Sequence, residues 1–155
     1  MAIKVLFYAI NGMGMGHLSR QYAIAKKLRT LFLEHDLQPD IRILTTSEAD
    51  FLVQDFPVYK IPSVVSLKNH DLGRTHREYT SEGCHFVFQL VSRFQPDILI
   101  LDTQPQGGFQ EFSFIRDYAR MNVFIQRHVR SDHPKLTSYL EHINLFDLVL
   151  VPDQE

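Results

Sequence analysis

Short apolar segments alternate along this chain with longer segments in which apolar residues recur every three or four positions. The first pattern is typical of parallel strands covered on both faces, and the second of amphipathic helices. The expected strands are residues 3–10, 40–45, 58–61, 98–101, 123–126 and 148–151. The expected helices are residues 17–34, 82–94, 109–120 and 134–143, with a short helix from Ser47; residues 63–80 are expected to be polar and irregular. This order predicts an α/β fold, a doubly wound parallel (Rossmann-like) sheet in a single three-layer αβα domain.

The first expected helix has a clear apolar side. Its apolar stripe runs through Leu18, Tyr22, Ala25 and Leu28. Its basic residues, Arg20, Lys26, Lys27 and Arg29, are expected to face water.

Composition narrows the class of protein. The 155 residues carry a formal net charge of -2, so no broad basic field is present and nucleic acid is not an expected partner. Cys84 is the one cysteine, which excludes an intrachain disulfide and favours a reducing, cytoplasmic setting. No segment approaches the roughly 20 apolar residues of a membrane span, so we expect at most peripheral membrane contact.

A glycine-rich segment, NGMGMGHLSR (residues 11–20), connects the first strand to the first helix. Glycines there allow a tight turn and leave room for a ligand beside the helix N-terminus, whose unpaired N–H groups attract anions and oxygens. The ligand-binding residues expected in this loop are Asn11, Gly12, Gly14, Gly16 and Ser19. The alternative is that the glycines only make a tight turn.

Two other strand ends carry polar residues that belong to the same expected site. Asp102 ends the fourth strand, and in the usual strand order it lies beside the loop that carries His17, close enough for a hydrogen-bonded pair. Gln104 follows in the next loop, and Arg127 and His128 leave the fifth strand. These basic residues either contact an anionic group or are simply solvated or paired with acids.

Two nucleotide-binding motifs fit the loop poorly. The dinucleotide fingerprint requires a third glycine where His17 or Ser19 stands, and the second strand ends without the acidic residue that binds ribose. The lysine of a phosphate-binding loop is also absent. A metal site is not expected either, because the spacing of His70, His76, Cys84 and His85 matches no established ligand pattern.

Three segments resemble the N-terminal half of glycosyltransferases of the two-Rossmann-domain (GT-B) type. They are FYAINGMGMGHLSR (7–20) continuing as AIAKKL (23–28), FQPDILILD (94–102) and FDLVLVP (146–152). The resemblance is closest to the branch of the lipid-linked N-acetylglucosaminyltransferase of peptidoglycan synthesis and related predicted transferases. It implies that residues 1–155 are the acceptor-side N-terminal domain and that the donor-binding C-terminal domain is absent from this chain.

The resemblance also implies a mechanism and partners. His17 would be the general base of an inverting, metal-independent transfer, with Asp102 as its partner; the donor is a nucleotide sugar and no cofactor is expected. The partners implied are a sugar acceptor and a separate C-terminal donor-binding domain or subunit. Two alternatives stay open: a non-catalytic binding or scaffolding subunit, and a nicotinamide-dependent oxidoreductase.

Overall fold

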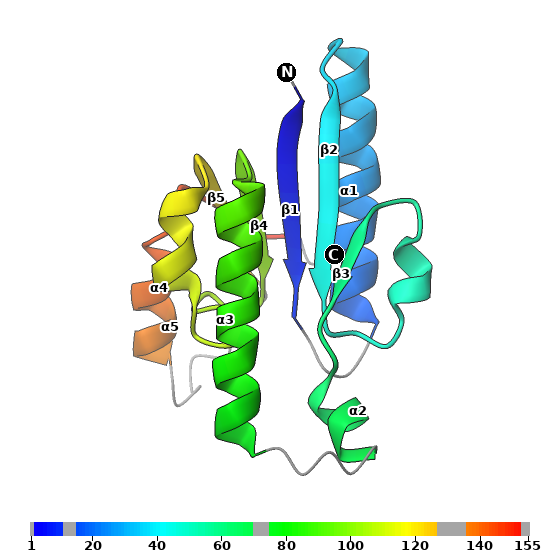
Figure 1. Cartoon of the computed structure of the whole chain (residues 1–155). Coiled ribbons are helices and arrows are strands. Elements are labelled where there is room, and N and C mark those ends of the chain that lie inside the picture. The colour runs from blue at the N-terminus through cyan, green and yellow to red at the C-terminus, as the bar shows by residue number, and fades with distance from the viewer. Residues whose placement is uncertain (1, 11–14, 70–74, 127–135, 153–155) are drawn as a thin grey trace.

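Parallel strands form one sheet with helices on both faces in the computed structural model of this chain, which describes residues 2–10, 15–69, 75–126 and 136–152 (Figure 1). The strands in this part of the chain are β1 (Ile3–Ala9), β2 (Pro39–Thr45), β3 (Val58–Lys60), β4 (Ile98–Asp102), β5 (Met121–Ile125) and β6 (Leu148–Leu150). Their order across the sheet is β3-β2-β1-β4-β5-β6, and every neighbouring pair is parallel. The predicted doubly wound α/β fold is therefore confirmed.

Helices connect these strands. They are α1 (Gly16–Glu34), α2 (Val64–Asn69), α3 (His76–Phe94), α4 (Phe112–Ile115) and α5 (Leu136–Ile143), with 3-10 turns η1 (Asp50–Val53) and η2 (Arg116–Tyr118). Helix α1 packs on one face of the sheet, while α3, α4 and α5 pack on the other.

The expectation of an irregular segment over residues 63–80 is wrong. Residues 64–69 form α2, and α3 begins at His76 instead of at residue 82. A capping box explains the early start: the Glu78 backbone N–H donates to Thr75 Oγ1 (3.2 Å), and the Thr75 N–H donates to Glu78 Oε2 (2.8 Å).

Two other expected helices are shorter than their apolar patterns suggest. The short helix after β2 begins at Asp50, not at Ser47, whose hydroxyl instead accepts from the Ala49 N–H at 3.2 Å. The helix expected over 109–120 is reduced to α4 and η2, since Gln110 has a φ of 64°, which no helix accommodates.

Successive side chains of the central strand β1 pack on opposite faces of the sheet, as its pleat requires. Val5, Phe7 and Ala9 of β1 pack with α1, whereas Leu6 and Tyr8 pack with the α3 side. All these side chains are almost completely buried. The sheet therefore has an apolar core on each face, and its polar groups lie mainly at the two ends of the strands.

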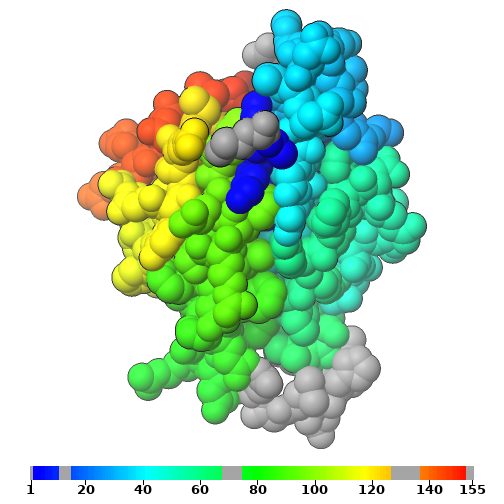
Figure 2. Space-filling view, turned by 45° about the horizontal axis from the view of Figure 1, so that its top comes forward, coloured from blue at the N-terminus to red at the C-terminus, as the bar shows by residue number. Residues whose placement is uncertain are grey.

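The amino ends of the strands come forward in Figure 2, where the beginning of β1 reaches the surface between α3 and β2. A hollow of about 490 Å³ opens near this edge, lined by cationic and aromatic side chains that include Lys4, Arg42 and Phe94. No helix in the described part of the chain is long and apolar enough to cross a membrane.

Candidate functional site

The carboxyl edge of the sheet brings two predicted site residues together. Strands β1 and β4 are neighbours, with Tyr8 paired to Leu101, so the carboxyl ends of both strands lie side by side at this edge. His17 lies in the first turn of α1, and its Nδ1 is 3.4 Å from Oδ1 of Asp102. The expected proximity of these two residues is thus present in the structure.

Asp102 has closer partners than His17. Arg20 donates through Nη2 to both carboxylate oxygens, at 2.6 and 2.7 Å, and through Nε to Oδ2 at 3.1 Å. The hydroxyl of Thr103 donates to Oδ1 at 2.6 Å. The Asp102 side chain is 0% exposed, so it acts on a ligand only through these neighbours.

The same contacts set the ionisation state of Asp102. Its burial raises the pKa, but the hydrogen bonds from His17, Arg20 and Thr103 outweigh burial and hold the pKa below its ordinary value of 3.8. Asp102 is therefore a carboxylate at neutral pH, compensated by a guanidinium.

Arg20 is the first site residue that sequence reasoning missed. It was expected to face water, but its side chain is only 30% exposed because it turns toward Asp102. The spacing of Arg20 and His17 along the helix does indicate that the two side chains lie together. Arg20 follows His17 by three positions, which places both side chains on the same side of a helix.

Thr103 is the second missed residue. Its Oγ1 lies 2.9 Å from His17 Nδ1, so it is nearer to the imidazole than Asp102 is. Thr103 has a φ of 72°, a left-handed conformation that is exceptional for a β-branched residue. No sequence pattern predicts this conformation at a threonine.

The imidazole of His17 reaches the surface. Its side chain is 15% exposed, and α1 begins without a side-chain N-cap, which leaves N–H groups of its first turn available. A methyl group built on Gly16 meets no atom of the described residues within 4 Å.

The other predicted ligand-binding residues are only partly placed. Ser19 is exposed, and its hydroxyl donates to the Met15 carbonyl (2.8 Å) within α1. Gln104 is exposed in the loop after β4, on the same edge as His17. The remaining predictions, Asn11, Gly12, Gly14, Arg127 and His128, lie outside the described residues.

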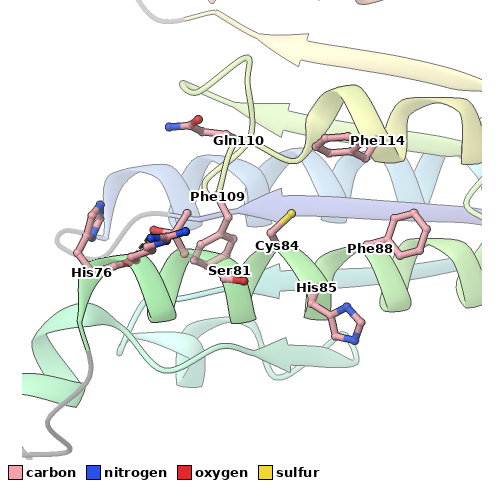
Figure 3. A pocket seen from close by; sticks show the side chains of 10 residues that line it. His76, Ser81, Cys84, His85, Phe88, Phe109, Gln110 and Phe114 are labelled. Carbon is pink, nitrogen blue, oxygen red and sulfur yellow. Dashed lines mark hydrogen bonds between the residues drawn. The ribbon is translucent and has the colours of Figure 1, made fainter.

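A groove of about 820 Å³ lies between α3 and the segment 109–114 (Figure 3). Phe109 forms its inner wall, and Cys84 points from α3 toward the 109–114 segment, while His85 points away from it. Gly83 allows α3 to approach the Phe109 ring closely, because a Cβ at this position would lie 2.3 Å from the ring. His76 and Arg77 stand at the α3 N-terminal end of the groove, and Phe88 and Phe114 at the other end.

The loop 103–111 joins this groove to the cluster around His17. The buried side chain of Glu111 stabilises this loop. Glu111 is fully buried, and its Oε2 accepts from the Phe109 N–H at 2.7 Å. Gly107, with a φ of 87°, passes so close that a Cβ would lie 2.7 Å from the carboxylate. Burial raises the pKa of Glu111 to about 7 despite the backbone N–H groups that bond it.

No group of three potential metal ligands occurs among the residues that the structure describes. Of the four residues considered for a metal, His76, Cys84 and His85 line the groove, and His70 lies outside the described ranges.

The fold defines the class, a Rossmann-like α/β domain with polar groups gathered at the carboxyl edge of its sheet. No family model and no curated protein matches the sequence.

Solved structures with this fold do exist. One is a protein from Listeria monocytogenes assigned as a UDP-N-acetylglucosamine 2-epimerase, with a TM-score of 0.61 and 15% identity over 99% of this chain and 40% of that one. Another UDP-N-acetylglucosamine 2-epimerase has a TM-score of 0.60 and 15% identity over 98% of this chain and 42% of its own. The chain thus spans about two fifths of the length of either structure. At this identity the likeness is one of fold.

Proposed function

We propose that this chain is the acceptor-side domain of a two-domain nucleotide-sugar enzyme, in which His17 is the general base of an inverting glycosyl transfer. One observation carries the proposal: a surface-accessible imidazole at the carboxyl edge of a Rossmann-like sheet, whose Nδ1 contacts polar groups and whose Nε2 has no hydrogen-bond partner among the described residues. The fold shared with two UDP-N-acetylglucosamine 2-epimerases supports the nucleotide-sugar part.

In this reaction the acceptor hydroxyl gives its proton to His17 Nε2 while its oxygen attacks the anomeric carbon of the donor. The bond from that carbon to the diphosphate oxygen breaks, and the nucleoside diphosphate leaves with the electron pair. In this proposal the donor binds mainly to a second domain, as in the two-domain transferases that the sequence resembles. A positioned base contributes about 10²- to 10⁴-fold in rate.

The groove beside α3 is suited to the rest of the acceptor. The groove borders the loop that also carries Thr103. A molecule whose hydroxyl binds His17 would therefore have the apolar wall of the groove and the cation of Arg77 beside it at the same edge of the sheet. Such a groove favours an acceptor with an apolar part and a negative group.

The test is transfer from labelled UDP-N-acetylglucosamine by this chain together with its donor-binding domain. His17→Ala is expected to lower turnover about 10²- to 10⁴-fold, with an unchanged thermal unfolding midpoint. His35→Ala, an exposed histidine at the other end of α1, is the matched control and is expected to retain full activity. Normal turnover in His17→Ala would reject His17 as the base.

A second candidate function is favoured by the names of the two structural neighbours. The chain would then be part of a nucleotide-sugar epimerase, which converts its substrate without an acceptor. The same assay separates the two functions, because an epimerase alters the sugar of UDP-N-acetylglucosamine without transferring the labelled sugar to an acceptor. Cofactor binding measured by nicotinamide fluorescence would instead indicate an oxidoreductase.

A further inference from the structure

Thr103 combines an unfavourable backbone conformation with a central place in the hydrogen-bond network. Its φ of 72° is costly for a threonine, yet its N–H still donates to Ile125 O (3.2 Å), as expected of a residue that continues the sheet. The conformation places Oγ1 between Asp102 Oδ1 (2.6 Å) and His17 Nδ1 (2.9 Å). Strain at a site residue calls for a reason in function.

The number of hydrogens around His17 Nδ1 determines the direction of these bonds. Arg20 Nη2 has two hydrogens, and it has two carboxylate oxygens of Asp102 within 2.7 Å. Thr103 has one hydroxyl hydrogen, and its shorter contact is to Asp102 Oδ1. Both neighbouring donors therefore give their hydrogens to the carboxylate, although Arg20 Nη2 also lies 3.1 Å from Nδ1.

Because those hydrogens are donated to Asp102, His17 is the donor in its hydrogen bond with Thr103. Nδ1 carries a hydrogen and donates it to a lone pair of Thr103 Oγ1, which in turn donates to Asp102. Asp102 itself lies 3.4 Å from Nδ1, too far for a strong direct bond. The chain Nδ1–H to Oγ1–H to Oδ1 leaves the lone pair of the imidazole on Nε2.

We propose that Thr103 is a positioning residue that links His17 to the Asp102 carboxylate by hydrogen bonds and fixes the Nδ1–H tautomer. Arg20 compensates Asp102 so that the carboxylate stays buried and ionised. The catalytic consequence rests on the function proposed above, whereas the tautomer is a property of this chain alone. The two ideas therefore fail separately.

The first test is a measurement of the His17 tautomer in the chain as it stands. Two-bond ¹H–¹⁵N correlation spectra of the ¹⁵N-labelled protein, recorded where His17 is neutral, are expected to show the protonated nitrogen at Nδ1. A protonated Nε2 in the unsubstituted protein would overturn the proposal without any variant being needed.

Two substitutions of similar size then isolate the hydroxyl. Thr103→Val keeps the shape and removes the hydrogen-bonded link, and it is expected to shift His17 toward the Nε2–H tautomer. Thr103→Ser keeps the hydroxyl and is expected to retain the Nδ1–H tautomer. An unchanged tautomer in a folded Thr103→Val protein would show that the hydroxyl has no positioning role.

Kinetics of the enzyme completed by its donor-binding domain give an independent readout. Thr103→Val is expected to lower kcat about tenfold with little change in KM, since one hydrogen bond to the base is lost and none to the substrate. Thr103→Ser is expected to restore kcat, and an equal loss in both variants would contradict this role of the hydroxyl. Absence of any transfer would reject the proposed function and leave the tautomer result standing.

Discussion

Two bidentate pairs of arginine and aspartate lie at opposite edges of the same sheet. At the carboxyl edge, Arg20 binds Asp102, whose side chain is 0% exposed. At the amino edge, Arg42 binds Asp40 with two contacts of 2.9 Å, and both side chains are about a third exposed, at 32% and 31%. The chemistry of the pairs is the same, and their surroundings differ.

The surroundings decide what each pair does. Arg42 and Asp40 lie two positions apart on one strand, and the guanidinium rests 4.4 Å from the centre of the Phe94 ring, which covers part of its surface. Arg20 and Asp102 join a helix to a strand 82 positions away, and they touch a titratable imidazole. The Arg20–Asp102 pair therefore differs from the other in the burial of its carboxylate and in its contact with His17, the residue proposed as the base.

Removal of each aspartate tests most directly whether burial makes the two ion pairs differ in their contribution to stability. Asp102→Ala leaves Arg20 partly buried without its partner, and a loss of about 3 kcal/mol in the free energy of unfolding is expected. Asp40→Ala at the solvated edge should cost at most about 1 kcal/mol. Chemical denaturation of both variants measures the difference, and equal losses would show that burial does not distinguish the two pairs.

Glu111 sharpens the comparison because it is a buried carboxylate that, unlike Asp102, has no cation partner among the described residues. Its pKa is raised from 4.5 to about 7, so the unfolded chain releases this proton at lower pH than the folded one. The contribution of Glu111 to stability is therefore most favourable below pH 4.5 and falls by about 2–3 kcal/mol as the pH rises to 7. For Asp102, whose pKa is lowered from 3.8, the contribution is present above pH 3.8 and is lost as the pH falls further.

Glu111→Gln checks this sign. The amide carries no charge, so the fall in stability between pH 4.5 and pH 7 should be largely absent. The matched control is Glu141→Gln on the exposed side of α5, which should leave the pH profile of unfolding unchanged. A profile of the Glu111 variant that matches the parent protein would contradict the assignment.

The smallest expected effect concerns two left-handed residues that flank β4. Gln95, with a φ of 48°, ends α3 before the strand, and Thr103 follows at its other end. Gln95→Gly should stabilise the protein by about 0.5–1 kcal/mol, because glycine adopts this conformation without strain. Thr103→Gly gains a similar amount but loses its hydroxyl contacts, so no net gain is expected in thermal unfolding.

The fold was largely predictable from the sequence because a buried parallel strand is a continuous apolar run. Residues 98–101 and 123–126 therefore indicated β4 and β5 within a few residues. The start of α3 was missed although Thr75 and Glu78 have the spacing of a capping box. The residues around this capping box are mostly polar and lie outside the apolar helical pattern, which alone indicates a loop.

The candidate site was predictable only where topology determines it. His17 and Asp102 follow neighbouring parallel strands, so the strand order alone brings them to one edge. Arg20 was missed because an arginine among lysines on an amphipathic helix usually faces water, and its partner is 82 positions away. Thr103 was missed because its role depends on a conformation that threonine rarely adopts.

The compensation of Asp102 by Arg20 has a consequence for how the site responds to salt. The two opposite charges are in contact, so together they produce only a weak, short-ranged field at the His17 imidazole. A neutral hydroxyl group meets no long-range attraction there, and its binding should hardly change between low and high ionic strength. Any strong salt dependence of ligand binding would then originate elsewhere, for example at the exposed Arg77 of the groove.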